Sequence, residues 1–265
     1  MDYFWEIYHR LRNRRNISGG APETGASTMA RPDFSHVVQE LSARFVWPEP
    51  IKPFPELPRT ELMLFPSQAD RTLIVIPGWN SSVKKFKYAY LVDTLQQRDL
   101  ASVVIMNNPD PGEDVDYTEQ LFRQADAVTR FAIANQASLN GNKDRLKLSV
   151  MGSSAGGGAA AVIAGRYNQT VDSVFLVGPA QDVPFSAIAA HMQNITGELF
   201  VIRGEYDHYC TEDNANTYLG MAPNALTTGV AHIGRGDHGL SSAANAIQLA
   251  GLITSQLLTT SQKNS

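Results

Sequence analysis

The chain has 265 residues, of which 43% are hydrophobic and 18% are charged, and its formal net charge is -4. This composition is ordinary for a globular protein, and the length suits one large domain or two small ones. The chain lacks the basic excess that neutralises phosphates, which excludes nucleic acid as an expected partner. A single cysteine, Cys210, rules out a disulfide within the chain. No apolar run approaches the roughly 18 residues that a membrane span needs.

Residues 1–28 are interpreted as an extension that precedes the folded domain. The stretch "MDYFWEIYHRLRNRR" has aromatic residues before its arginines, the reverse of a secretory signal, and "NISGGAPETGAST" has the composition of a flexible linker. An alternative is an amphipathic helix that docks on the domain or on a membrane surface. We expect a flexible or amphipathic extension over 1–28 and one domain over 29–265. Since no signal peptide or transmembrane segment is seen, we expect a cytoplasmic protein.

From residue 59 onward, strand patterns alternate with helix patterns. Continuous apolar runs that end in turn residues predict strands buried on both faces, and apolar residues at helical spacing predict helices. Strands are predicted at 60–65, 72–78, 101–109, 146–152, 172–178, 198–204 and 226–233. Helices are predicted at 83–98, 115–138, 155–167, 184–193, 212–221 and 241–258.

This alternation predicts an α/β fold: a doubly wound, mostly parallel open sheet flanked by helices. In such sheets the ligand site lies beyond the carboxyl ends of the strands. The segments expected along that edge are "PGWN", "NNPDPG", "GSSAG", "GPAQD", "GEYDHY" and "GRGDHG". The short connection between Gly178 and Glu198 leaves little room for a cap domain.

The pentapeptide "GSSAG" at residues 152–156 matches the pattern G-x-S-x-G. The pattern is centred on Ser154 and not on Ser153, because the latter would require glycine where Met151 stands. Between a strand and a helix, this pattern makes a sharp turn that exposes the serine hydroxyl above the sheet. The helix N-terminus adds the N–H of Ala155 and a positive partial charge, which suit a developing oxyanion. Ser154 is therefore the candidate nucleophile, with a plain turn as the alternative and Ser153 as a structural neighbour.

A serine hydroxyl is a weak nucleophile unless a base takes its proton, and that base needs a third group to fix its tautomer. In folds with this serine turn, the acid and then the histidine follow the serine in the chain. Asp207 follows one buried strand and His238 follows the next, so both are expected at the same edge of the sheet. The candidate triad is Ser154, Asp207 and His238.

Other residues of the same types compete for these roles. Three histidines lie inside a predicted element or beside the acid and are weaker candidates for the base than His238: His191, His208 and His232. For the acid, Asp182 is the best alternative to Asp207, because it follows the preceding strand. Glu205 and Asp237 are interpreted as solvated loop charges. The second oxyanion donor is assigned to the backbone N–H of Trp79, with Asn80 next, and the Trp79 ring either walls an acyl pocket or covers the core.

Residues 59–258 resemble the α/β-hydrolase superfamily through "PGW", "GSSAG", "RGEYD" and "GRGDHG". The stretch "GSSAGGGAAA" is similar to the serine turn of carboxylesterases and hormone-sensitive-lipase-like enzymes, although "PGWN" stands where those enzymes have H-G-G-G. The stretch "NGNKDRLKLSVMGSSAGG" and the closing "GDHG" are similar to esterases of the dienelactone-hydrolase type. Those esterases have a cysteine nucleophile where this chain has serine.

The resemblance implies an α/β-hydrolase fold with little or no cap, and a serine esterase that cleaves small-molecule carboxylic esters. Ser154 would attack the carbonyl, His238 would carry the proton, Asp207 would orient the histidine, and the N–H groups of Ala155 and Trp79 would form the oxyanion hole. Neither a metal nor an organic cofactor is implied. A thioesterase, lipase, peptidase or acyltransferase would use the same residues, and a catalytically silent binding protein is a further alternative.

Overall fold

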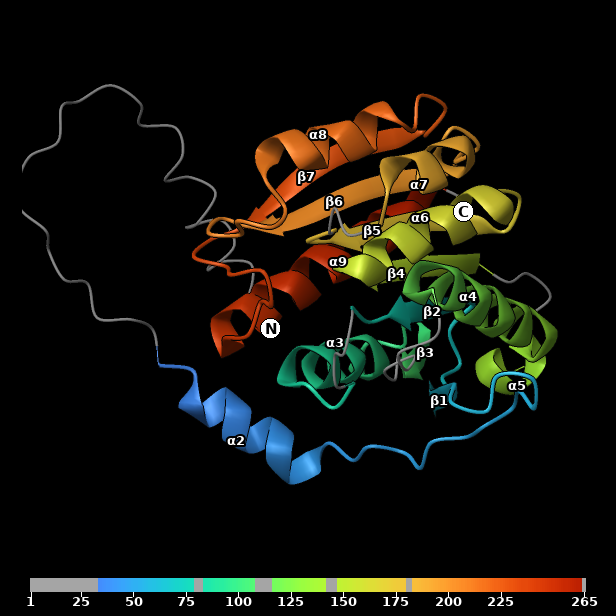
Figure 1. Ribbon diagram of the computed structural model, residues 1–265. Coiled ribbons are helices and arrows are strands. Elements are labelled where there is room, and N and C mark those ends of the chain that lie inside the picture. Colours follow the sequence, from blue (N-terminus) through green and yellow to red (C-terminus); the bar gives the residue numbers. More distant parts are fainter. Residues whose placement is uncertain (1–32, 79–82, 108–115, 142–146, 180–182, 264–265) are drawn as a thin grey trace, which may run out of the picture. The chain divides into compact units, whose positions relative to one another are not determined.

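The computed structural model describes residues 33–78, 83–107, 116–141, 147–179 and 183–263 (Figure 1). The extension predicted over residues 1–28 lies outside these ranges, and the compact unit that carries the described strands and helices begins at Phe34. Within the described ranges, none of the helices combines the length and apolar character needed to cross a bilayer.

A seven-stranded sheet with the order β1-β3-β2-β4-β5-β6-β7 forms the centre of this unit. The strands are β1 Glu61–Phe65, β2 Arg71–Ile76, β3 Ser102–Asn107, β4 Lys147–Ser153, β5 Val171–Val177, β6 Glu198–Gly204 and β7 Thr227–Ile233. β1 pairs antiparallel with β3, and every other neighbouring pair is parallel. The structure thus confirms the predicted mostly parallel, open α/β sheet.

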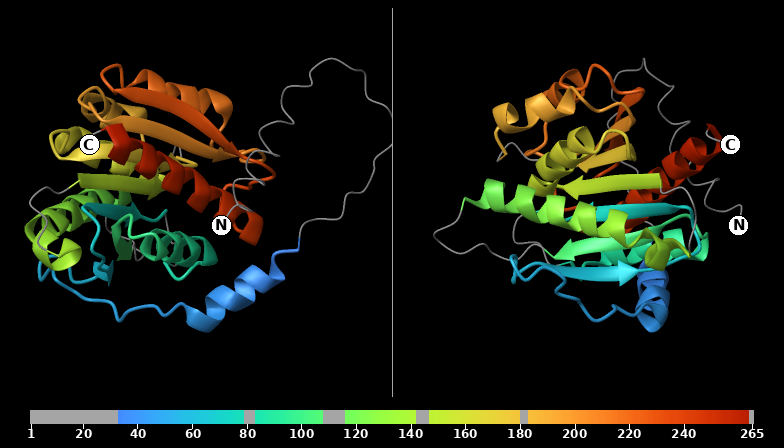
Figure 2. Two further views of the ribbon diagram at one scale, coloured as in Figure 1. Left: turned by 180° about the vertical axis from the view of Figure 1, so that it is seen from behind. Right: turned by 90° about the vertical axis from the view of Figure 1, so that its right-hand side faces the viewer.

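Helices cover both faces of the sheet (Figures 1 and 2). One face carries α2 Ser35–Arg44, α3 Phe86–Gln97 and α9 Ala243–Lys263. The other carries α4 Tyr117–Ala134, α5 Gln136–Asn140, α6 Ala155–Arg166, α7 Phe185–Met192 and α8 Glu212–Gly220. The apolar run of β2 shows the effect: Leu73 and Val75 pack on the face that α2, α3 and α9 cover, whereas Ile74 and Ile76 pack on the opposite face. Successive side chains of a strand point to opposite faces, so a sheet covered on both faces favours continuous apolar runs in its strands.

Three helices differ from the sequence prediction. The prediction of one continuous helix over 115–138 is wrong, because the structure has two helices, α4 and α5, separated at Asn135. The side-chain Nδ2 of Asn135 donates to the carbonyl of Phe131 at 2.8 Å. Such a local side-chain bond offers the backbone an alternative to continuing the helix. α2 was not predicted, and it is tied to α3 by the Arg44–Asp93 ion pair. α9 continues past residue 258, where the hydroxyl of Thr260 donates to the carboxylate of Glu198.

Candidate active site

Ser154 lies in the turn between β4 and α6, with φ 54° and ψ -126°. A residue with a side chain rarely adopts a positive φ, and such strain persists only where the surroundings impose it. Here a Cβ on Gly152 would overlap the carbonyl of Gly156, and a Cβ on Gly156 would overlap the carbonyl of Ile76. The N–H of Ser154 donates to the carbonyl of Val177 at 2.9 Å, which ties the turn to β5. The turn therefore holds the Ser154 hydroxyl at the carboxyl edge of the sheet.

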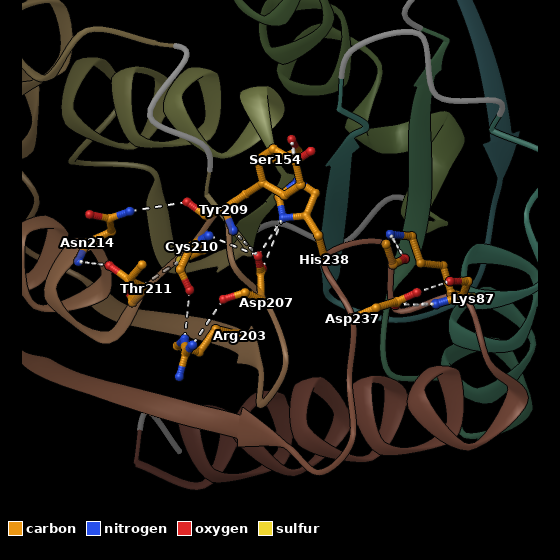
Figure 3. Close-up of polar contacts among 12 residues, drawn as sticks. Lys87, Ser154, Arg203, Asp207, Tyr209, Cys210, Thr211, Asn214, Asp237 and His238 are labelled. Atoms are coloured by element: carbon orange, nitrogen blue, oxygen red, sulfur yellow. Dashed lines mark hydrogen bonds and ion pairs between the residues drawn. The ribbon is translucent and has the colours of Figure 1, made fainter.

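The structure brings Ser154, His238 and Asp207 together from three separate segments (Figure 3). His238 Nε2 lies 2.9 Å from Ser154 Oγ, and His238 Nδ1 lies 3.0 Å from each carboxylate oxygen of Asp207. The side chain of His238 is 25% exposed and that of Asp207 is 1% exposed. An ionised carboxylate can only accept hydrogen bonds, which assigns a proton to Nδ1; in the neutral imidazole Nε2 then presents its lone pair to the serine hydroxyl.

The backbone after β6 holds the Asp207 carboxylate in place. Its Oδ1 accepts from the N–H groups of Tyr209 and Cys210, both at 2.9 Å. Burial acts to raise the pKa of Asp207, but the hydrogen bonds from His238, Cys210 and Tyr209 outweigh it, so the pKa lies below its usual value. Asp207 is therefore a carboxylate at neutral pH, able to orient His238 and to stabilise its protonated form.

Arg203, on β6, holds the same segment from the other side. Its guanidinium donates from Nε to the carbonyl of Cys210 at 2.8 Å and from Nη2 to the carbonyl of Asp207 at 3.2 Å. Its Nη1 pairs with Glu212 at 3.2 Å, and Glu212 also lies 2.7 Å from Nε2 of His232 on β7. The planar, rigid fork of arginine suits this role, because one side chain fixes two carbonyls and a carboxylate at once.

Lys87, on α3, contacts the segment that carries His238. It is 6% exposed, and its Nζ donates to the carbonyl of Gly239 at 2.9 Å. Burial lowers the pKa of Lys87 to about 8, although the nearby charge of Asp237 acts against this shift. Asp237 itself accepts hydrogen bonds from the N–H and the hydroxyl of Ser241. The backbone that follows His238 is thus held by side-chain hydrogen bonds at Gly239 and Ser241.

Two glycines allow the close approach of the segments that carry the triad. A Cβ on Gly78, just after β2, would lie 2.8 Å from Ser154 Cβ. Gly178, just after β5, has φ 51°, and a Cβ there would lie 2.9 Å from Asp207 Oδ2 and 3.4 Å from His238 Nδ1. Any side chain at these two positions would displace the triad.

The other residues singled out from the sequence lie elsewhere. Ser153 is buried in β4, and Ala155 is the first residue of α6. Three of the predicted site residues lie outside the described ranges: Trp79, Asn80 and Asp182. Of the competing histidines, His191 lies on α7, His208 is exposed after β6, and His232 lies on β7. The exposed acids each accept a hydrogen bond from a backbone N–H group. Glu205 accepts from Arg235, and Asp237 accepts from Ser241.

Sequence reasoning did not single out Lys87 or Arg203. A signal for each was present, because Lys87 lies at helical spacing from the core residues Leu91 and Leu95, and Arg203 interrupts the apolar run "FVIRG". A charged side chain in an apolar stripe is buried at a cost unless it is paired. Across the residues that the structure describes, no cluster of histidine, cysteine, aspartate and glutamate is placed to hold a metal ion.

No protein-family model matches the sequence, and no curated protein is significantly similar to it. Solved structures are similar in fold. A dienelactone hydrolase from Anabaena variabilis is 18% identical with a TM-score of 0.64, over 80% of this chain and 98% of that chain. An alpha-beta serine hydrolase homologue from Coxiella burnetii is 15% identical with a TM-score of 0.61, over 80% of this chain and 98% of that chain. The chain has the α/β-hydrolase fold.

A third similar α/β structure, Est1E from Butyrivibrio proteoclasticus, is 9% identical with a TM-score of 0.57, over 76% of this chain and 95% of that chain. These identities are low, so the likeness concerns the path of the α/β-hydrolase backbone and not the chemistry of the site. Unrelated reactions occur on one fold, and the function must be argued from the side chains.

Proposed function

We propose that this protein is a serine hydrolase that cleaves carboxylic esters through an acyl-enzyme intermediate. The observation that carries the proposal is the continuous line of contacts from Ser154 Oγ through both ring nitrogens of His238 to Asp207. A nucleophile within hydrogen-bond distance of a base, which in turn contacts an orienting acid, is the arrangement that acyl transfer requires. The fold of the neighbouring structures supports a hydrolase.

In the acylation half, His238 Nε2 takes the proton of the Ser154 hydroxyl while Oγ attacks the ester carbonyl carbon. The carbonyl oxygen becomes an oxyanion next to the N-terminus of α6, where the N–H of Ala155 and the helix dipole favour negative charge. The bond between the carbonyl carbon and the alcohol oxygen then breaks, and that oxygen takes the proton from Nε2. The acyl group stays on Ser154 Oγ.

In the deacylation half, His238 takes a proton from water, the hydroxide attacks the acyl carbon, and Ser154 regains its proton as the acid leaves. Asp207 stays ionised throughout and stabilises the imidazolium that forms twice per turnover. The N–H of Trp79 is our proposed second oxyanion donor. No step assigned to these residues requires a metal or an organic cofactor.

A fluorophosphonate probe tests the nucleophile directly, because it forms a covalent adduct with an activated serine. We expect intact-mass spectrometry to show one adduct on the wild-type protein and none on Ser154→Ala. Ser153→Ala is the matched control, since its side chain is a buried neighbour of the same chemistry, and it should keep the adduct. An adduct retained in folded Ser154→Ala, or absent from the folded wild-type protein, contradicts the proposal.

The bond cleaved is tested with an ester, a thioester and an amide that share one acyl group. We expect the highest kcat/KM for the ester, with activity abolished in Ser154→Ala. A higher value for the thioester or the amide would assign the protein to thioesterases or peptidases. Added alcohol tests acyl transfer, because an acyltransferase would form the new ester in preference to the free acid.

A further inference from the structure

Tyr209 lies at the candidate active site with most of its side chain exposed. The residue is 71% exposed, yet its ring centroid lies 5.0 Å from that of His238, with the two planes inclined by 51° (Figure 3). Single exposed aromatic residues are common on protein surfaces and need no explanation. Contact with the ring of the catalytic base distinguishes this one.

The backbone of Tyr209 is held on both sides, so the point from which its side chain extends is fixed. Its N–H donates to Oδ1 of Asp207 at 2.9 Å, and its carbonyl accepts from Nδ2 of Asn214 at 3.2 Å. Asp207 is 3% exposed and Asn214 is 8% exposed, so both anchors are buried. A rigid aromatic side chain on a fixed backbone loses little conformational entropy when it binds a ligand.

The proton transfers of acylation determine which part of an ester meets this ring. After attack by Ser154, the alcohol oxygen must accept the proton that His238 Nε2 carries, so it lies within hydrogen-bond distance of that nitrogen. The group attached to this oxygen therefore lies beside the imidazole, where Tyr209 packs. The acyl group, in contrast, remains bonded to Ser154 Oγ.

We propose that Tyr209 forms the wall of a subsite for the alcohol portion of the substrate, and that this subsite favours esters of aromatic alcohols. The inference rests on the proposed esterase function and names the substrate class of the same site. Aromatic pairs attract beyond the effect of area burial, so a ring on the alcohol gains more from this wall than a saturated ring of equal size. Tyr209 touches substrate in this role and is not part of the proton relay.

The test compares benzyl acetate with cyclohexylmethyl acetate, which share the acyl group and nearly share the size of the alcohol. The wild-type protein is expected to show a kcat/KM about two- to tenfold higher for the benzyl ester. Tyr209→Phe keeps this ratio, and Tyr209→Ala loses it. Tyr206→Ala is the matched control, because Tyr206 is an exposed tyrosine of the same segment, at 57% exposure, and it should keep the ratio.

Separate rates for acylation and deacylation distinguish a contact of Tyr209 with the alcohol group from an effect of Tyr209 on His238. The loss in Tyr209→Ala should fall on acylation by the benzyl ester and not on hydrolysis of the acetyl-enzyme, because the alcohol has already left at that stage. An unchanged ester ratio in Tyr209→Ala, or an equal slowing of acetyl-enzyme hydrolysis, would overturn the inference. Fluorophosphonate labelling of Ser154 reports separately on the proposed function, so the subsite can fail while the hydrolase stands.

Discussion

Lys87 donates a hydrogen bond from its buried ammonium group to the backbone carbonyl of Gly239, 2.9 Å away and one residue beyond His238. The contact joins α3 to the segment after β7, which are 152 positions apart in the chain. A buried lysine is unfavourable by itself, because desolvation opposes its charge. Its place beside His238, the proposed base, indicates that the contact positions this histidine.

Replacing Lys87 with methionine should therefore separate activity from stability. Methionine keeps the length and apolar character of the side chain but cannot donate to Gly239. We expect kcat/KM for a simple ester to fall on the order of ten- to hundredfold, as the imidazole moves relative to Ser154. The free energy of unfolding should not fall in parallel, because the cost of burying a charge is also removed. Lys85→Met, an exposed lysine at the start of α3, is the control and should match the wild-type kinetics.

The lowered pKa of Lys87 predicts how stability depends on pH. Between its folded value of about 8 and its ordinary value of 10.5, the unfolded chain holds a proton that the folded chain does not. The free energy of unfolding should therefore rise with pH in this window, by up to about 1.4 kcal/mol per pH unit from this group. Below pH 8 both states are charged and the contribution is flat.

Urea unfolding of the wild-type protein and of Lys87→Met across this window isolates the contribution of Lys87. The difference between the two free energies, wild type minus variant, should increase as the pH rises from 8 toward 10.5. A difference that stays constant would show that Lys87 has an unshifted pKa in the folded protein.

Arg203 should be needed to hold the Asp207 segment. Arg203→Met removes the donors to the carbonyls of Cys210 and Asp207. A buried carbonyl left without a hydrogen-bond donor costs about 1–3 kcal/mol of stability. We expect kcat/KM to fall about tenfold or more and hydrogen exchange to quicken in the peptide that contains residues 204–211. Arg166→Met, on α6 and paired with Asp126 at 3.6 Å, is the control. Exchange equal to the wild type in Arg203→Met would count against this role.

Gly178→Ala should disrupt the proposed triad although none of the three residues is substituted. The added methyl group would lie 2.9 Å from Asp207 Oδ2, and the backbone keeps a positive φ of 51° that costs an alanine roughly 1–2 kcal/mol. We expect a loss of stability of that order or larger and a fall in kcat/KM on the order of a hundredfold. Gly220→Ala is the matched control, because a Cβ there meets nothing within 4 Å. Wild-type kinetics in Gly178→Ala would show that the site tolerates the methyl group.

Much of this protein could be predicted from local sequence patterns. Continuous apolar runs identified the buried strands, because successive side chains of a strand point to opposite faces of the sheet and both faces are covered. The order of strands and helices then led to a parallel sheet with one functional edge. The frame of glycines around Ser154 located the strained turn, since only glycine fits at positions 152 and 156 against neighbouring backbone. Asp207 and His238 followed from their places after successive strands.

Tertiary structure decided what depends on contacts between distant segments. The buried contact of Lys87 with Gly239 joins residues 152 positions apart, and no local pattern encodes such a pairing. The tilt of the Tyr209 ring against His238 is of the same kind. Hydrophobic periodicity reports which face of an element is buried, whereas the partner of a buried charge or ring is determined by how the elements pack.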